Sequence, residues 1–356
     1  MKIEFEKYGY YPALRTRPSE MFGYSKLSKE DKAKLLPIMT LGIWPKQEGL
    51  NESLMQVQKA TGDLPFILDL TREATHQNSE LKKLLNSDEN FKAWREFVKK
   101  VPNAIPVVQI PPGTKNPQVI RQAKAFEKMG LEKVAFRITD FGLDAEKVTN
   151  ALSAMDSAEN ALVIIDVGYI RETMAASIAA SVTAINNVRE DVEDAIIAVI
   201  STSFPASVTS HTDPNSGGKR GIINILERVL HQEIGADAAI YGDHGSIHAK
   251  VYPTKGGRYT PRIDYPLYDA WVFERRPDTN STGYVDAAET IIANYPEIKD
   301  DQTWGAEMIR QASTGTIDGM KTPSSWIAAR VNMHISRQLE LSLEAEDDEE
   351  DLDDLI

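Results

Sequence analysis

The chain has 356 residues, of which 42 % are hydrophobic and 26 % charged, and it contains no cysteine. This ordinary globular composition excludes a collagen, a wholly disordered chain and a disulfide scaffold. No run of about 18 apolar residues is present, so we expect no membrane span. The N-terminal sequence MKIEFEKYGYYPAL lacks the apolar core of a signal peptide, and with the missing cysteine it predicts a cytoplasmic location.

The formal net charge is −13, and its placement matters more than its size. Nine acidic residues and no basic residue lie in the segment EAEDDEEDLDDLI at 344–356. The charge of the remaining chain is therefore −4, close to neutral for its length. Because no run of lysine or arginine occurs, we expect no bulk affinity for nucleic acid.

Short apolar runs rich in β-branched residues recur along the chain at intervals of about 30 residues. Such short, continuous runs are typical of strands that are covered on both faces, as in a parallel sheet. Eight are found, at residues 36–44, 65–71, 104–110, 133–139, 161–168, 194–202, 238–244 and 268–275. Helical spacing of apolar residues occurs between them, at 90–101 and 117–130, and again at 287–295.

This alternation of strand and helix predicts parallel pairing with right-handed crossovers, and eight units predict a closed (β/α)₈ barrel of the TIM-barrel type. An open doubly wound sheet is the alternative, but no G-x-G-x-x-G follows the first strands. We expect one domain over 1–340, with an N-terminal motif at 1–30, eight β/α units at 36–276 and a helical closure at 284–340. A disordered acidic tail is expected at 341–356.

In a barrel of this class, functional side chains gather at the carboxyl ends of the strands. The candidate catalytic residues at these ends are Asp69, Asp166, Asp243 and His244. Asp166 follows a buried run directly, where an unpaired carboxylate is costly. It is either a general base, a metal ligand or a partner for a substrate hydroxyl, or else a helix cap or an ion-pair partner of Arg137 or Arg171.

The adjacent Asp243 and His244 in YGDHG place an imidazole beside a carboxylate, an arrangement suited to acid–base work or to metal binding. No known metal motif is matched, so we assign neither a metal site nor a cofactor. Ser203 in STSFP lacks a nucleophile elbow and is expected to bond a ligand or cap a turn. Arg275 and Arg276 form a fork suited to phosphate or carboxylate, or to ion pairs with rim acids.

Several segments, taken in order, resemble the Beta protein family, which is found in phages, prophages and bacterial accessory islands. They are YYPALRTRPSE (10–20), LSKEDKAKLLPIMTL (27–41), SFP (203–205), YGDHG (241–245) and SSWIAARVNMHISRQL (325–340). His244 stands where the family usually has tyrosine, and Met333 stands where a histidine is expected. The resemblance covers most of residues 8–340.

The resemblance implies a barrel-like α/β fold and a setting in phage or prophage biology within a bacterial host cell, without an established reaction. It marks as family-pattern positions Arg15, Arg17, Glu20, Ser203, Asp243, Trp326, Asn332 and His334. Together with the strand-end residues, these positions predict a rim site for a small anionic ligand. Its predicted binding residues are Arg15, Arg17, Glu20, Gln109, Arg137, Ser203, Arg275, Arg276, Trp326, Asn332 and His334.

The acidic tail is a solubilising extension, a docking peptide, or a segment that imitates phosphate charge and occupies a basic groove on a DNA enzyme. Its end, a run of acids closed by Leu-Ile, is similar to the protein-docking tips of single-stranded-DNA-binding proteins. The predicted docking residues are Asp351, Asp353, Asp354, Leu355 and Ile356.

Two functions follow from these observations. In the first, the chain is an interaction protein in phage–host conflict or anti-phage defence, and its tail docks a nucleic-acid-handling partner. In the second, it is a rim hydrolase, similar to a phosphodiesterase, acting on a small phosphorylated or nucleotide-like substrate. In that case Asp69, Asp166 and Asp243 supply acid, base or metal-binding groups, and Arg137, Arg275 and Arg276 hold the anion.

Overall fold

Eight parallel strands close into a barrel in the computed structural model of the chain, which describes residues 3–250, 259–277 and 279–353, with side chains through residue 345. The ring closes where Tyr11 pairs with Gly242 and Pro12 with Asp243, so the predicted barrel of the TIM-barrel type is confirmed. In ring order the strands are β1 (Tyr11–Arg15), β2 (Ile38–Leu41), β3 (Phe66–Leu70), β4 (Ala104–Val108), β5 (Val134–Ile138), β6 (Ala161–Tyr169), β7 (Ile196–Thr202) and β9 (Ile240–Asp243).

The assignment of the eighth barrel strand to 268–275 is wrong. That segment does form a strand, β11 (Ala270–Arg275), but it pairs antiparallel with β8 (Arg220–Asn224) and β10 (Arg262–Pro266) in a separate sheet. The barrel begins instead with β1, whose sequence YPALR contains a proline and ends in a charge, so it gives no continuous apolar run. Burial on both faces of the small sheet produced the misleading apolar run of β11.

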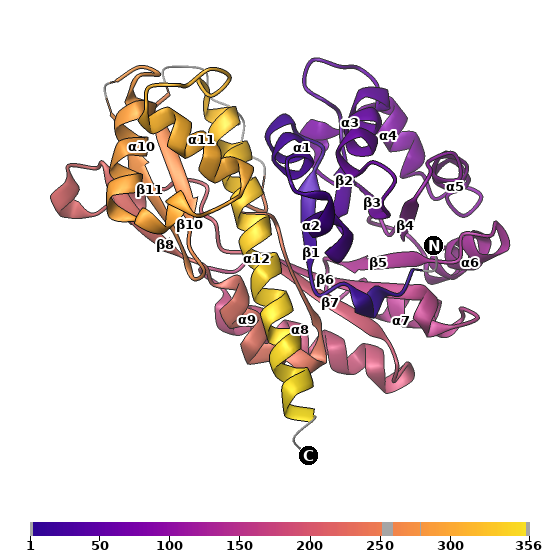
Figure 1. Cartoon of the computed structure of the whole chain (residues 1–356). Coiled ribbons are helices and arrows are strands. Elements are labelled where there is room, and N and C mark those ends of the chain that lie inside the picture. The colour runs from indigo at the N-terminus through magenta and orange to yellow at the C-terminus, as the bar shows by residue number, and fades with distance from the viewer. Residues whose placement is uncertain (1–2, 251–258, 278, 354–356) are drawn as a thin grey trace.

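Helices cover the outside of the barrel between successive strands (Figure 1). They are α1 (Pro18–Ser25), α2 (Lys29–Lys34), α3 (Asn51–Thr61), α4 (Ser79–Leu84), α5 (Lys92–Val98), α6 (Asn116–Lys128), α7 (Ala145–Ser153), α8 (Met174–Asp191) and α9 (Glu227–Ile234). The long α12 (Pro323–Asp353) packs its Val331, Ile335 and Leu339 into the core shared by these helices and the strands. Arg228 of α9 also bonds α12 at Gln338, so α12 completes the outer ring between α9 and α1.

The three-stranded sheet forms a lobe beside the barrel, with α12 running between the two (Figure 1). One face of the sheet packs on α10 (Gly283–Asn294), α11 (Trp304–Ser313) and α12. The opposite face packs Trp271 and Phe273 against Phe204 and Val208, which follow barrel strand β7. The lobe is therefore built on the carboxyl end of the barrel from the β7–α9 connection and the chain after β9.

Strand alternation determines what the barrel interior contains, because successive side chains point to opposite faces. Apolar residues fill its interior, among them Ile38, Ile67 and Ile164. Two positions further along the same three strands, the inward residues are Thr40, Asp69 and Asp166, respectively. The same step leads from Val107 to Gln109, from Ala135 to Arg137 and from Gly242 to His244. Polar side chains thus collect in one layer at the carboxyl rim, above an apolar interior.

Within the described ranges, no helix combines the length and apolarity that crossing a membrane requires. The helical backbone of α12 continues into the acidic segment as far as Asp353. The side chains of the predicted docking residues lie outside the described part of the chain, as do residues 354–356 entirely. Their docking role and the disorder of the tail stay predictions.

Candidate functional site

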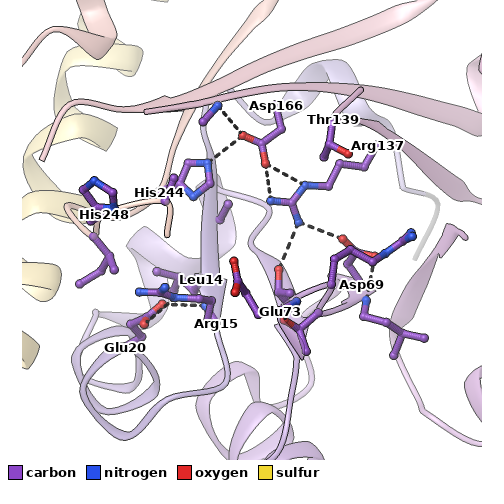
Figure 2. A pocket seen from close by; sticks show the side chains of 18 of the residues that line it. Leu14, Arg15, Glu20, Asp69, Glu73, Arg137, Thr139, Asp166, His244 and His248 are labelled. Atoms are coloured by element: carbon purple, nitrogen blue, oxygen red, sulfur yellow. Dashed lines mark hydrogen bonds and ion pairs between the residues drawn. The ribbon is translucent and has the colours of Figure 1, made fainter. Parts of the chain in front are cut away.

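A cavity of about 200 Å³ opens at the carboxyl ends of the barrel strands (Figure 2). Its walls come from strands on opposite sides of the ring and from the loops that follow them. Six of the predicted site residues lie in its lining or at its floor: Arg15, Glu20, Asp69, Arg137, Asp166 and His244. This is the position at which (β/α)₈ enzymes carry their active sites.

Arg137 lies at the centre of the cavity floor, where it bridges two carboxylates. Its Nη1 donates to Asp69 Oδ2 at 2.9 Å and to Thr40 Oγ1 at 3.2 Å, while its Nη2 donates to Asp166 Oδ2 at 2.6 Å. The three charged side chains are only 7–13 % exposed. Burial alone would lower the pKa of Arg137, but the two carboxylates raise it above its ordinary value. Arg137 therefore organises the floor and is already neutralised.

Asp166 also holds His244, through an Oδ1–Nε2 distance of 2.9 Å. A β-bulge follows Asp166, and the backbone N–H of Gly168 donates to the same Oδ1 at 3.0 Å. Burial would raise the pKa of Asp166, but His244, Arg137 and these hydrogen bonds hold it well below its ordinary value. An ionised Asp166 accepts a hydrogen from Nε2, so Nδ1 of His244 is the nitrogen left to accept a proton.

Gln109 connects this floor to the cavity wall. It is fully buried at the end of β4, donating through Nε2 to Asp69 Oδ1 at 3.0 Å and accepting at Oε1 from Arg72 Nη2 at 3.1 Å. On another side of the wall, buried Glu20 accepts from the backbone N–H of Arg15 at 2.7 Å and from its Nε at 3.2 Å. Pro18 starts α1 directly after β1, and this short connection places Glu20 over the end of the strand.

Two charged side chains of the cavity form no ion pair with any described side chain, and both follow strand β3. Desolvation inside the cavity lowers the pKa of Arg72, while Asp69 and Asp144, which also line the cavity, act on it only from a distance and raise it. Arg72 is exposed, and apart from Gln109 it has no hydrogen-bond or ion-pair partner among the described side chains. Glu73 points its carboxylate into the cavity, again without a described side-chain partner (Figure 2). Neither residue is among the predicted site residues, although both come directly after the predicted strand 65–71. His248, which also lines the cavity and contacts the Tyr169 ring, was missed as well.

Asp243 and His334, both predicted site residues, contact each other away from the cavity. The carboxylate of Asp243 is fully buried between β9 and α12, where it accepts from Tyr10 at 2.8 Å and from Tyr241 at 3.0 Å. His334 Nε2 of α12 lies 3.0 Å from its Oδ2. The open rim position expected for Asp243 is therefore wrong, because alternation turns it outward while the next residue, His244, turns inward.

Three further family-pattern residues join elements of the fold. Ser203 is buried, and its backbone N–H and Oγ each donate to Glu227 of α9 at 2.6 Å. Asn332 accepts from the backbone N–H of Gly305 at 3.0 Å and donates to the carbonyl of Gly23 at 3.3 Å. Trp326 bonds the carbonyl of Met320 and stacks on a tyrosine of the lobe. None of the three is among the described residues that line the rim cavity.

The two arginines of the predicted anion fork lie in the lobe, so their expected place on the barrel rim is wrong. Arg276 pairs with Glu274 at 2.9 Å and also bonds Thr290 of α10 at 2.6 Å. Arg275 lines a different cavity, at the edge of the lobe. Arg17, at the N-terminus of α1, is absent from the described lining of the rim cavity. Arg275 and Arg276 lie in the lobe because β11, at whose end they stand, belongs to the small sheet and not to the barrel.

No three histidine, aspartate or glutamate side chains converge as metal ligands within the part of the chain that the structure describes. Among the described residues, the cavity offers an imidazole held by an ionised carboxylate, a guanidinium outside any ion pair and a carboxylate without a side-chain partner. An imidazole oriented in this way is suited to proton transfer. The guanidinium of Arg72 is suited to an anionic group on the same ligand.

The fold and the cavity define this chain as a parallel α/β-barrel protein with a polar ligand site at the carboxyl rim. Its sequence matches the Beta protein family over residues 10–340. It is also 47 % identical to "Protein beta" of Enterobacteria phage P4 over 358 aligned residues, which cover 99 % of this chain and 100 % of the phage protein. The chain belongs to the Beta protein family, and the expected link of that family to phages is confirmed.

Proposed function

We propose that the rim cavity binds a small phosphorylated or nucleotide-like molecule and hydrolyses it by acid–base chemistry. The observation that carries this proposal is that Arg72, which forms no ion pair with a described side chain, lies in the same cavity as the Asp166–His244 pair. Arg137 and Arg15 are already paired with carboxylates, so Arg72 is the cation best placed to hold an anionic group. Glu73 adds an acceptor for a ligand hydroxyl.

The size and charge of the cavity narrow the ligand class. A volume of about 200 Å³ is below the 300–1,000 Å³ typical of drug-sized ligands, so a sugar phosphate or mononucleotide fragment fits better than a dinucleotide. Such molecules combine an anion, which suits Arg72, with hydroxyl groups, which suit Glu73. In the hydrolysis, His244 Nδ1 takes the proton of an attacking water, the new P–O bond forms, the ester P–O bond breaks, and the leaving oxygen takes a proton from solvent.

The first experiment is a thermal-shift screen of the full chain against nucleotides, sugar phosphates and divalent metals. A ligand that binds only the folded state raises the melting temperature by mass action. We expect the shift to be lost in Arg72→Ala and kept in Arg121→Ala, because Arg121 is an exposed arginine of α6 outside the cavity. Equal shifts in these two variants would show that the ligand binds elsewhere.

Turnover of the ligand found in that screen tests the chemistry separately from binding. Removing a general base costs about 10² to 10⁴ in rate. His244→Gln should therefore lower kcat by about that factor, and Asp166→Asn should also lower it because the imidazole loses its orienting charge. Unchanged kcat in both variants would leave a binding protein without acid–base chemistry.

A second proposal places function in the acidic tail. The chain would act in phage–host conflict in the cytoplasm of a bacterial host, with residues 344–356 docking a nucleic-acid-handling protein. The supporting observation is the run of nine acids closed by Leu355 and Ile356, together with the course of α12, which carries the chain past the end of the barrel (Figure 1). This site lies far along the sequence from the rim residues, so it can be removed independently.

Three forms of the chain test the tail: the full chain, the 1–343 truncation, and a Leu355→Ser/Ile356→Ser variant that keeps every charge. Capture of one identified nucleic-acid-handling protein by the full chain alone supports docking through both charge and the terminal apolar pair. Such binding should weaken with added salt, because exposed charges are screened within about 10 Å at 0.1 M. Equal capture by the truncated chain would refute the proposal.

A further inference from the structure

A second cavity, of about 260 Å³, lies at the seam between the lobe and the barrel. Its walls come from the loop at 206–209 after β7, from β10 and β11, and from the starts of α10 and α12. It shares no described lining residue with the rim cavity. We refer to it as the seam cavity.

Two arginines lie side by side on adjacent strands of the sheet and line the seam cavity. Arg262 of β10 and Arg275 of β11 are directly paired in the antiparallel register, so their side chains leave the same face. Like charges directly opposite each other destabilise a sheet. A position of this kind is expected to have a compensating anion nearby.

The protein supplies only part of that compensation. Asp264 pairs with Arg262 at 3.0 Å, but it also pairs with the buried Arg330 of α12 at 2.6 Å, so one carboxylate serves two guanidinium groups. Arg275 forms no ion pair with any described carboxylate, and its side chain makes one long contact of 3.4 Å to the carbonyl of Gly218. Burial and the nearby Arg262 lower the pKa of Arg275. The wall therefore carries an excess of positive charge.

A buried hydroxyl provides an independent indication of a ligand. Tyr284, in the first turn of α10, is 0 % exposed; it packs on the other face of the sheet and is also among the residues that line the seam cavity. Its hydroxyl has no hydrogen-bond partner in the described part of the protein. A buried hydroxyl left unpaired costs about 1–3 kcal/mol, so such groups in native proteins normally have a partner. The same ligand that neutralises Arg275 would supply an acceptor for this donor.

We propose that the seam cavity binds a phosphate dianion, either free or as the terminal group of a phosphomonoester. Arg275 and Arg262 present planar donors that match the oxygens of a phosphate, and the Tyr284 hydroxyl donates to a further oxygen. The small volume suits a phosphate group with little attached to it. Since its walls come from both barrel and lobe, the bound dianion would hold the lobe against the barrel.

The test is isothermal titration of the full chain with inorganic phosphate, at an ionic strength held constant with sodium chloride. All proteins carry Arg72→Ala, so that the rim cavity does not contribute. We expect saturable binding that weakens by about tenfold in Arg275→Gln, since one charge-assisted hydrogen bond to phosphate is lost. Arg121→Gln, the matched surface control, should bind as before.

Two further measurements, a melting temperature and a phosphate affinity, distinguish a ligand site from a structural role of these residues. In phosphate-free buffer, Arg275→Gln should not lower the melting temperature, because it removes a like-charge pair. Tyr284→Phe keeps the ring packing and should weaken phosphate binding severalfold.

Tighter binding of a nucleoside monophosphate than of phosphate would assign the site to phosphomonoesters, and equal binding would assign it to the phosphate group alone. Absence of saturable binding, or unchanged affinity in both Arg275→Gln and Tyr284→Phe, overturns the proposal.

Discussion

Replacing Arg137 with methionine tests whether the cavity floor depends on one shared cation. The substitution keeps a long side chain but removes four hydrogen bonds, to Asp69, Thr40 and Asp166. Both carboxylates are less than 10 % exposed, so each would lose its ion pair with Arg137 in a buried place. Breaking a buried ion pair in this way costs about 3–5 kcal/mol.

The remaining contacts place the expected loss near the lower end of that range. Asp166 keeps His244 and the Gly168 N–H, and Asp69 keeps Gln109 and its neighbouring backbone N–H. We therefore expect Arg137→Met to reduce the free energy of unfolding by about 3 kcal/mol at pH 7. Adding Asp166→Asn to this variant removes one of the two buried carboxylate charges that Arg137 had neutralised and should restore part of the loss.

The stability lost in Arg137→Met should depend on pH, and the direction of that dependence follows from the pKa of Asp166. In the parent protein the pKa of Asp166 is depressed, so its stabilising contribution is complete above the ordinary value and is lost only as pH falls through the folded value. Without Arg137 that pKa rises, and protonation at mildly acidic pH relieves the buried charge. The stability difference between parent and variant should therefore shrink between pH 7 and pH 5.

Urea unfolding followed by circular dichroism at both pH values measures this difference. Arg121→Met, an exposed control, should change stability by no more than about 0.5 kcal/mol. A loss below about 1 kcal/mol for Arg137→Met, or a loss that grows toward pH 5, would refute the electrostatic account of the floor.

Three further variants test other parts of the structure. Burial would raise the pKa of Asp243, but the His334 imidazole and the groups that donate hydrogen bonds to Asp243 lower it. Asp243→Asn should therefore have a lower free energy of unfolding at pH 7. That free energy should also fall less steeply at acidic pH than in the parent protein. Gly23→Ala would place a Cβ 2.5 Å from the carbonyl oxygen of Ala328 and should cost about 1–3 kcal/mol in urea unfolding; no loss would mean that α1 and α12 separate freely. Ser203→Ala should cost about 1–3 kcal/mol, because it leaves buried Glu227 short of a donor, and a loss of ligand binding at unchanged stability would contradict its structural role.

The sequence predicted the strands of the barrel well where their apolar runs were continuous. Seven of the eight predicted runs overlap barrel strands, and their polar ends gave Asp69, Arg137, Asp166 and His244 as site residues. The failure at β1 has a simple cause, since a short strand with a proline and a terminal arginine carries little apolar signal. The failure at β11 arises because a small sheet buried on both faces has the same pattern as a barrel strand.

Arg72 and Glu73 show a different limit of sequence reasoning. Both are ordinary charged residues directly after a predicted strand, and charged residues at such positions are usually solvated or paired. Only the three-dimensional arrangement shows that the neighbouring cations, Arg15 and Arg137, already have carboxylate partners. The absence of such a partner, within the described residues, is what distinguishes Arg72 from them.

The sequence by itself determined the period of the fold, the apolar interior of the strands and the layer of polar residues at their carboxyl ends. These are local properties, because alternation along a strand and burial of apolar runs depend on neighbouring residues. Tertiary structure alone decided which strand closes the ring and which side of each strand faces inward. Asp243 and His244 are adjacent, yet α12 covers the first and the cavity receives the second. That outcome depends on contacts between segments up to 233 residues apart, which no local pattern encodes.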